Sequence, residues 1–274
     1  MINQQLSRFA THENSAYPQL WRGCVGAWCP SLGPSGSRLH DYSRRNNWGT
    51  LTNMDPATDW IVSGGQYALD CDATDDQIDC GPNVPSGGAC SVAAWVQRIG
   101  ATPNHNTIAA SKGGLQGDSE STFALYFNAF LGWSWFVVDS SNNLTIVRSN
   151  TSTSTGVWYF ACGVASASAI TLYIDGQQRA TAAGGLAKSS NHVTKLAGLT
   201  DSATSYASNA MLDDVRVYNR ALSFGEQLLL SRRRGIAFTP RTRARGTPEQ
   251  AAGGATPWLY ARRRSQIIGA GGVH

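Results

Sequence analysis

The sequence predicts an all-β fold, a two-sheet antiparallel sandwich with an extended arm at each end and one short helix. Short stretches rich in β-branched and aromatic residues recur along the 274 residues, and turns rich in Gly, Asn and Ser separate them. The hydrophobic content of 42% is ample for a sizeable core. Asp175-Gly176 has the sequence of a two-residue hairpin turn, which indicates that the strands on either side of it pair antiparallel.

Taken in order, the chain begins with a polar, irregular segment over residues 1–19, which we interpret as an arm. The first strand pattern is Leu20–Trp28, and a long segment rich in Gly, Ser and Asn, Pro30 to Asn53, follows it. An acidic loop is expected at Asp72–Asp79. The other predicted strands are Trp60–Val62, Tyr67–Cys71, Ser91–Arg98, Thr107–Ser111, Ser121–Phe127, Trp133–Val138, Leu144–Arg148, Trp158–Val164, Ile170–Ile174, Val193–Leu199 and Met211–Tyr218.

The last of these strands, Met211–Tyr218, mixes apolar residues with charged ones. Its apolar residues alternate with Asp213, Asp214 and Arg216. Because successive side chains of a strand point to opposite faces, we expect one face of this strand to be buried and the other to meet water.

A single helix is predicted directly after the closing strand. Ser223 and Glu226 have the spacing of a capping box, in which each side chain accepts a hydrogen bond from the other residue's backbone N–H. Arg232–Arg234 would then stand in the last turn, where the helix dipole is negative, and Gly235 would supply the left-handed end.

The closing strand and helix also carry a family resemblance. The segment Leu212–Ser223, with the Glu-containing helix after it, resembles the closing strand of LamG-like domains, the concanavalin A-type jelly rolls. Segments Ala68–Cys80, Ala89–Val96 and Ile170–Gly176 resemble other strands of the same family. The resemblance implies a jelly-roll sandwich at residues 20–234, with an N-terminal arm at 1–19 and a basic C-terminal arm at 235–274.

Charge separates the C-terminal arm from the rest of the chain. Residues 1–231 carry 13 Lys and Arg against 17 Asp and Glu, a balance of −4, whereas residues 232–274 carry nine Arg and one acid, a balance of +8. An arm of this composition cannot build its own core, so we expect a partner to order it. The residues expected to bind that partner are Phe238, Trp258, Leu259, Tyr260, Arg262, Arg263, Arg264, Ile267 and Ile268.

Catalytic patterns are absent from the sequence, and we predict that the chain is not an enzyme. Glycoside hydrolysis normally needs two carboxylates, which jelly-roll β-glucanases, by resemblance, place on one strand as Glu-x-Asp-x-x-Glu. None of the four glutamates begins such a pattern, and neither a G-x-S-x-G elbow nor an HExxH helix occurs. The five histidines fall in predicted loops or termini. No catalytic residue is nominated.

Calcium is the one cofactor that the sequence suggests. Asp75 and Asp76 stand in the acidic loop, and carboxylates are the hard oxygen ligands that Ca²⁺ takes, although solvated turn residues without EF-hand spacing remain the alternative. Resemblance to glucanases implies Asp213 as another ligand of a structural Ca²⁺, together with backbone carbonyls from near the N-terminus. Asp213 facing solvent, or paired with Arg216, is the alternative.

The six cysteines form no CxxC pair and match no zinc site. Free, buried thiols are the simplest interpretation, and a Cys71–Cys80 disulfide stays open for a protein that acts outside a cell.

Trp133 and Trp135 share one strand face, where they either stack on sugars or fill the core, so no carbohydrate-binding residue is chosen. The Arg-rich arm attracts phosphates, yet its apolar anchors favour a protein interface over nucleic acid.

These features lead to two hypotheses about function. The first is a structural component of a large extracellular assembly, with a phage virion decoration, spike or tail-associated protein as the leading case. Its arm would dock on a scaffold or capsid-type protein, or on copies of itself, while a lectin-like domain faces outward. The alternative is a carbohydrate-binding module of a secreted or cell-surface protein. The first 20 residues show no apolar core of a secretory signal, and no stretch is long and apolar enough to span a membrane.

Overall fold

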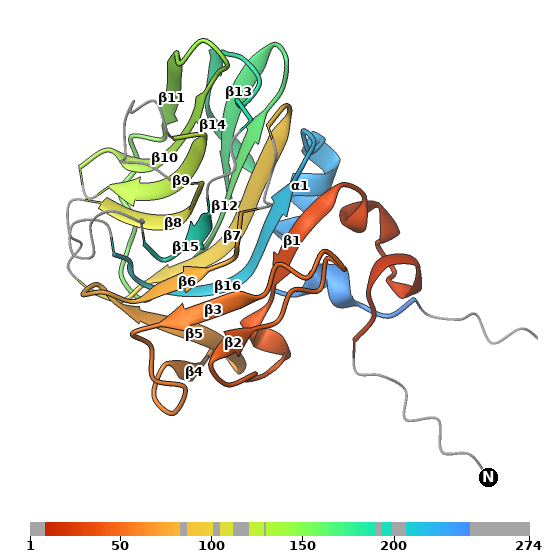
Figure 1. Cartoon of the computed structure of the whole chain (residues 1–274), viewed down its shortest axis with the longest axis vertical. Helices are drawn as coiled ribbons and strands as arrows, with labels where there is room; N and C mark the ends of the chain where they lie inside the picture. Colours follow the sequence, from red (N-terminus) through yellow and green to blue (C-terminus); the bar gives the residue numbers. More distant parts are fainter. Residues whose placement is uncertain are drawn as a thin grey trace, which may run out of the picture. The chain divides into compact units, whose positions relative to one another are not determined.

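The structure, a computed structural model, describes residues 9–82, 87–100, 105–111, 121–128, 130–189, 193–198 and 207–241. Two antiparallel sheets stack face to face in this part of the chain (Figure 1). The predicted all-β sandwich is therefore confirmed, and each predicted strand overlaps an observed one. The first compact unit ends at Arg241. Of the nine predicted arm residues, only Phe238 lies within the described residues.

The first sheet has the strand order β14-β13-β12-β7-β16-β5-β4, and β1 also pairs with β16. The predicted closing strand, β16, lies inside this sheet, between β7 and β5. The strands are β1 (Cys24–Trp28), β4 (Trp60–Ser63), β5 (Gln66–Asp72), β7 (Cys90–Arg98), β12 (Trp158–Ala165), β13 (Ala169–Ile174), β14 (Gln177–Ala183) and β16 (Asn209–Tyr218).

The second sheet has the order β11-β10-β9-β8-β15-β6-β3-β2. Three of its strands lie where we expected loops, because β2 and β3 fall inside the Gly/Ser/Asn-rich segment and β6 inside the acidic loop. These strands are two to four residues long, too short to show alternation in the sequence. The strands are β2 (Arg38–Leu39), β3 (Gly49–Thr52), β6 (Gln77–Asp79), β8 (His105–Ser111), β9 (Phe123–Asn128), β10 (Gly132–Val138), β11 (Leu144–Arg148) and β15 (Thr194–Leu196).

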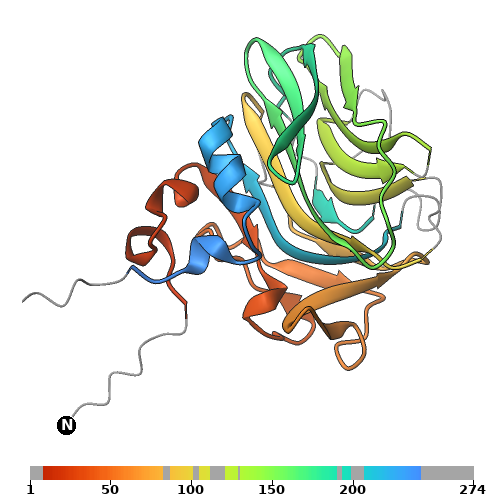
Figure 2. The ribbon, with the colours of Figure 1, turned by 180° about the vertical axis from the view of Figure 1, so that it is seen from behind.

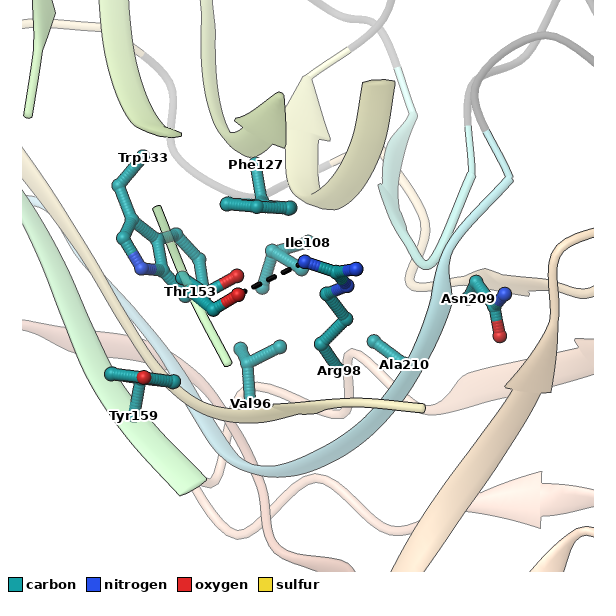
Figure 3. Close-up of a pocket in the computed structure, with 9 residues that line it drawn as sticks. All are labelled: Val96, Arg98, Ile108, Phe127, Trp133, Thr153, Tyr159, Asn209 and Ala210. Atoms are coloured by element: carbon teal, nitrogen blue, oxygen red, sulfur yellow. Dashed lines mark hydrogen bonds between the residues drawn. The ribbon is translucent and has the colours of Figure 1, made fainter. Parts of the chain in front are cut away.

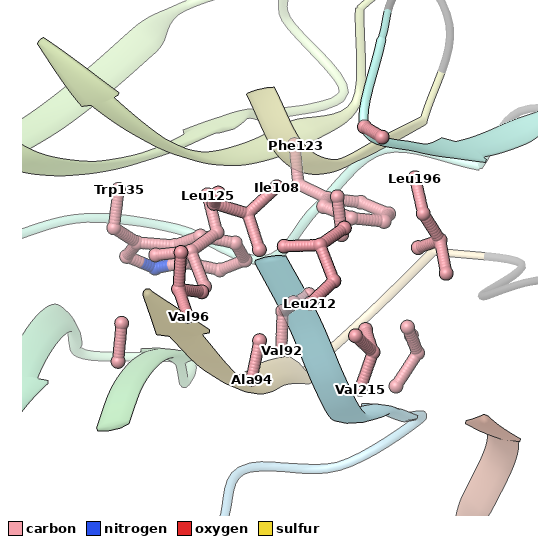
Figure 4. Packing of buried hydrophobic residues seen from close by; sticks show 14 of the residues in the cluster. Val92, Ala94, Val96, Ile108, Phe123, Leu125, Trp135, Leu196, Leu212 and Val215 are labelled. Atoms are coloured by element: carbon pink, nitrogen blue, oxygen red, sulfur yellow. The ribbon is translucent and has the colours of Figure 1, made fainter. Parts of the chain in front are cut away.

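The main core lies between the two sheets, and Figure 4 shows the two layers of side chains facing each other. Alternate residues of β7 and β16, such as Val92 and Leu212, point into it from the first sheet, and residues of β9 and β10 meet them from the second. Trp133 and Trp135 both belong to this core, with exposed fractions of 2% and 0%. Gly163 of β12 makes room for Trp135, since a Cβ at Gly163 would collide with the indole ring.

The outer face of the first sheet is covered by segments from both ends of the chain (Figure 2). They are the short helices η2 (Pro18–Trp21) and η4 (Ile236–Phe238) and the helix α1 (Phe224–Leu230). Ser15 and Pro240 form a β-bridge, and the Ala10 N–H donates to Phe238 O at 2.8 Å. The predicted boundaries of both arms need correction, because Phe9 and Tyr17 of the predicted N-terminal arm and Ile236–Phe238 of the predicted C-terminal arm pack on the sandwich.

The predicted capping box is present at the start of α1, where the N–H of Glu226 donates to Ser223 Oγ at 3.3 Å and the N–H of Ser223 to Glu226 Oε2 at 3.0 Å. Arg220 adds two charge-assisted bonds to the same carboxylate, at 2.7 and 2.8 Å. The helix ends at Leu230, earlier than expected. Gly235 does adopt the left-handed conformation, with φ of 67°, but it begins η4 instead of ending α1.

Candidate ligand-binding site

One end of the sandwich is crossed by residues 149–157, which lead from β11 of the second sheet to β12 of the first. We call this segment the strap. Arg98 of β7 holds it twice, because Arg98 Nη1 donates to Thr153 O at 2.9 Å and the Gly156 N–H donates to Arg98 O at 2.8 Å. The Ser154 N–H donates to the Tyr159 hydroxyl at 3.1 Å. These bonds fix the strap to the first sheet.

A small pocket lies beneath the strap, between the two sheets (Figure 3). We call it the inner pocket. It has room for about one water-sized group. Its residues are Val96, Arg98, Ile108, Phe127, Trp133, Thr153, Tyr159, Asn209 and Ala210.

A second pocket adjoins the first, since Trp133, Thr153 and Tyr159 line both. We call it the outer pocket, and its other residues are Thr151, Ser152, Ile174, Asp175 and Arg179. Asp175 and Arg179 are exposed and carry opposite charges. Asp175 is exposed as a residue, but partial burial of its carboxyl group raises the pKa of Asp175, while the bond from the Phe160 N–H and the charge of Arg179 act in the opposite direction.

Two buried polar atoms on residues that line these pockets lack a hydrogen-bond partner among the described residues. They are Trp133 Nε1 and Thr153 Oγ1, on side chains whose residues are only 2% and 7% exposed. Buried polar groups in folded proteins are almost always hydrogen-bonded, to protein, water or ligand. A water or a ligand hydroxyl that came within reach of either atom would therefore gain a hydrogen bond.

The turn between β9 and β10 borders the strap and carries exposed apolar side chains. Phe130 is 83% exposed and Leu131 is 38% exposed. The Asn150 N–H donates to Leu131 O at 3.2 Å, which joins this turn to the strap. Asn128 Oδ1 accepts from the N–H groups of Phe130 and Leu131 at 2.8 and 3.0 Å, so the turn is held by its own hydrogen bonds.

The structure places Asp213, a predicted Ca²⁺ ligand, in a fully buried site on β16. Its Oδ1 accepts from the N–H groups of Ser31 and Asp214 at 2.9 and 2.8 Å, and its Oδ2 lies 3.6 Å from Arg234 Nε. Calcium takes oxygen ligands, and these neighbours are N–H donors and a guanidinium, so this site does not fit the ion. Burial and the charge of Asp214 raise the pKa of Asp213 to about 7.

Asp214 and Arg216 form a buried ion pair, in contrast to the water-facing positions we expected. Arg216 Nε donates to Asp214 Oδ1 at 2.8 Å, and the guanidinium lies 4.7 Å from the Trp21 ring and 4.9 Å from the Phe238 ring. The register of β16 shifts between Asp213 and Arg216, with φ of 43° at Asp214. The prediction that one face of β16 meets water is wrong, because η2 and η4 cover that face. Phe238 is likewise buried, at 2%, and unavailable to a partner.

The acidic loop does bring carboxylates together. Ligand oxygens of Asp72, Asp75 and Asp76 lie within 4.8 Å of one another. The Asp72 N–H donates to Asp76 Oδ2 at 2.9 Å, and burial raises the pKa of Asp76 to about 6. This oxygen-only set suits a hard cation such as Ca²⁺ better than the Asp213 site does, and Ca²⁺ here stays a prediction.

The six cysteines and the two described glutamates, Glu13 and Glu226, take structural positions. All six cysteines are free and buried, and burial raises the pKa of each thiol, which makes them poor nucleophiles. Glu226 is held by the helix cap and Arg220, and the exposed Glu13 lies 3.6 Å from Arg44. In the described part of the chain, no helix is both long and apolar enough to cross a membrane.

Comparison with known proteins gives one family and a set of solved structures that share the fold. The family model described as concanavalin A-like lectin/glucanases superfamily matches residues 72–226. No curated protein matches the sequence.

Among solved structures, two are equally similar by TM-score. The binding domain of Paraclostridial Mosquitocidal Protein 1 has a TM-score of 0.58 at 13% identity, over 78% of this chain and 52% of that one, so this chain spans about half of it. Domain 4 of an extracellular arabinanase from Geobacillus stearothermophilus, solved with arabinotriose, also scores 0.58 at 16% identity, over 76% of this chain and 98% of that domain. Trypanosoma rangeli sialidase with sialic acid scores 0.54 at 14% identity, over 77% of this chain and 33% of the enzyme. At these identities, the likeness shows a shared fold.

Proposed function

Because the chain belongs to the concanavalin A-like lectin/glucanases superfamily, we propose that its sandwich is a non-catalytic carbohydrate-binding module of a secreted or cell-surface protein. The observation that carries the proposal is the end of the sandwich under the strap. There, Trp133 and Tyr159 stand beside Asp175 and Arg179, and two buried polar atoms lack partners. Aromatic surface with a few polar groups is the usual composition of a small-ligand site.

Two further facts support binding without catalysis. The solved arabinanase domain that shares this fold was determined with a bound trisaccharide, and 98% of that domain is covered by the match. Within the described residues, Glu13 and Glu226 are each engaged with an arginine, and Glu226 also caps α1. Glycoside hydrolysis needs two carboxyl groups on either side of the bond that is cleaved, one of which acts as an acid. These two glutamates are paired with arginines instead.

A glycan array probed with the full chain tests this proposal. We expect the folded protein to bind a subset of the glycans, to lose that binding after heat unfolding, and to release no sugar from bound glycans over hours of incubation. Binding to none of the glycans would contradict the proposed module, and release of sugar would contradict its lack of catalysis.

A second role is favoured by the contrast in charge between the two parts of the chain. We propose that the basic segment from Thr242 to His274 attaches the module to an acidic protein surface, such as a scaffold, a capsid-type protein or another copy of this chain. The balance of −4 in residues 1–231 makes a second copy a ready electrostatic partner. In a virion, such a segment would anchor a lectin-like domain that faces outward.

Truncation after Arg241 tests this attachment, because the compact unit ends there. We expect the truncated chain to keep its melting temperature, while the full chain self-associates at low ionic strength and dissociates as salt screens the charges. Sedimentation of both chains at low and at about 0.5 M salt measures this. Equal association of the two chains would show that attachment to a second copy does not use this segment.

A further inference from the structure

We propose that the end of the sandwich under the strap binds one neutral monosaccharide unit, with a hydroxyl in the inner pocket and the apolar sugar face on Phe130. This inference rests on the proposed function and goes beyond it by naming the site and the chemical class of the sugar. It is carried by hydrogen-bonding capacity, by charge and by the exposed turn between β9 and β10.

The hydrogen-bonding capacity of the two unpartnered atoms matches a hydroxyl. Trp133 Nε1 can only donate, whereas Thr153 Oγ1 can donate or accept. A sugar hydroxyl accepts from the indole while it exchanges a second hydrogen bond with the threonine. The space is about that of one water-sized group, which admits a hydroxyl and excludes a ring. Because both side chains also line the outer pocket, the ring would lie there.

The charge of the outer pocket favours a neutral sugar over an acidic one. Asp175 accepts hydrogen bonds and Arg179 donates them, so vicinal hydroxyls, which do both, are complementary to the pair. A carboxylate on the ligand would be attracted by Arg179 and repelled by Asp175. These two effects offset each other, so an acidic sugar has no advantage in this pocket.

Phe130 supplies an apolar platform on the turn that is bonded to the strap. A single exposed apolar side chain is ordinary, but Phe130, Leu131 and Val157, exposed by 83%, 38% and 45%, belong to the strap and to the turn bonded to it. The two bonds to Asn128 hold the turn in place before any ligand arrives, which lowers the entropy cost of binding. An aromatic face covers the apolar face of a pyranose while its edge stays in water.

The chain offers matched variants to test this site. Trp133→Phe removes the unpartnered indole N–H of a residue that lines both pockets, and Trp135→Phe removes a second buried, unpartnered indole N–H, on a residue that lines neither pocket. Phe130→Ala removes the platform, and Phe224→Ala removes another exposed Phe, on α1. Asp175→Asn changes an exposed side chain of the outer pocket. Melting temperatures verify that each variant is folded.

Titration calorimetry with the best neutral glycan from the array gives the readout. We expect Trp133→Phe, Phe130→Ala and Asp175→Asn each to weaken binding about five- to tenfold, since one hydrogen bond or one stacked ring contributes roughly 1 kcal/mol. Trp135→Phe and Phe224→Ala should leave affinity within about twofold.

Three results would overturn the proposal, and they differ from one another. Unchanged binding by the three site variants would place the sugar elsewhere and leave the carbohydrate-binding function standing. Preference for sialylated over neutral glycans would overturn the proposed sugar class alone. Absence of glycan binding by the wild-type chain would remove the proposed function and this site with it.

Discussion

Asp214→Asn should lower the free energy of unfolding by about 3 to 5 kcal/mol, which is the usual effect of removing one member of a buried ion pair. Arg216 is fully buried, and Asp214 is its one salt-bridge partner among the described residues. Without that carboxylate, a guanidinium is left uncompensated between the Trp21 and Phe238 rings. Asparagine keeps the side-chain shape and tolerates the positive φ at this position, so the loss reflects the missing carboxylate, which also accepts from the Gly235 N–H at 3.0 Å, and not backbone strain.

The double variant Asp214→Asn/Arg216→Met is the control, because it removes the stranded charge as well. We expect it to recover a large part of the loss, as buried ion pairs are often replaced by apolar residues at little cost. Urea unfolding at pH 7, followed by Trp fluorescence, gives the three free energies. If the single and double variants are equally unstable, packing of the arginine stem is more important than its charge.

The sequence predicts the sandwich because strands and caps are local. Period-two patterns place most strands, and the spacing of Ser223 and Glu226 predicts the capping box. The burial of Asp213, Asp214 and Arg216 depends instead on segments distant in the chain. Trp21 from the N-terminal part and Phe238 from the C-terminal part cover the outer face of β16, and alternation within one strand carries no information about such a cover.

The candidate site shows the same limit in another form. Trp133 is identifiable from the sequence as an aromatic residue on a strand, but its partners come from a loop and a hairpin turn. Thr153 belongs to the strap, and Asp175 sits in the turn between β13 and β14. They meet only because the two sheets face each other, and strand order cannot be derived from strand patterns alone. Exposed Phe130 has no signature beyond its place in a turn.

Asp213→Asn should change how stability depends on pH. The carboxyl pKa of Asp213 is 3.8 in the reference state and about 7 in the folded protein. Between these values the folded state binds more protons than the unfolded state, so the free energy of unfolding falls as pH rises. The groups that face Asp213 are Asp214, which raises its pKa, and Arg234 and the Ser31 N–H, which lower it. The effect of burial on this pKa is larger than the effect of any of these groups.

Other groups shape the same profile in known directions. Asp76, with a pKa raised to about 6, adds to the fall in stability as pH rises from 3.8. Glu226, with a pKa lowered from 4.5 to about 2, contributes stability that is lost as pH drops through this window. Burial lowers the pKa of His12, so its contribution to stability increases as pH rises toward 6.5.

The difference between the wild-type and Asp213→Asn curves isolates one carboxyl from these opposing groups. Asparagine mimics the protonated acid, since its Oδ1 still accepts from Ser31 and Asp214 while it carries no charge. We expect the two proteins to be about equally stable near pH 4. Above pH 7 the variant should be more stable by a few kcal/mol, because each pKa unit corresponds to about 1.4 kcal/mol. Urea unfolding at intervals from pH 4 to 8 measures both curves. Parallel curves would mean that Asp213 ionises normally and that Arg234, 3.6 Å away, compensates its burial in full.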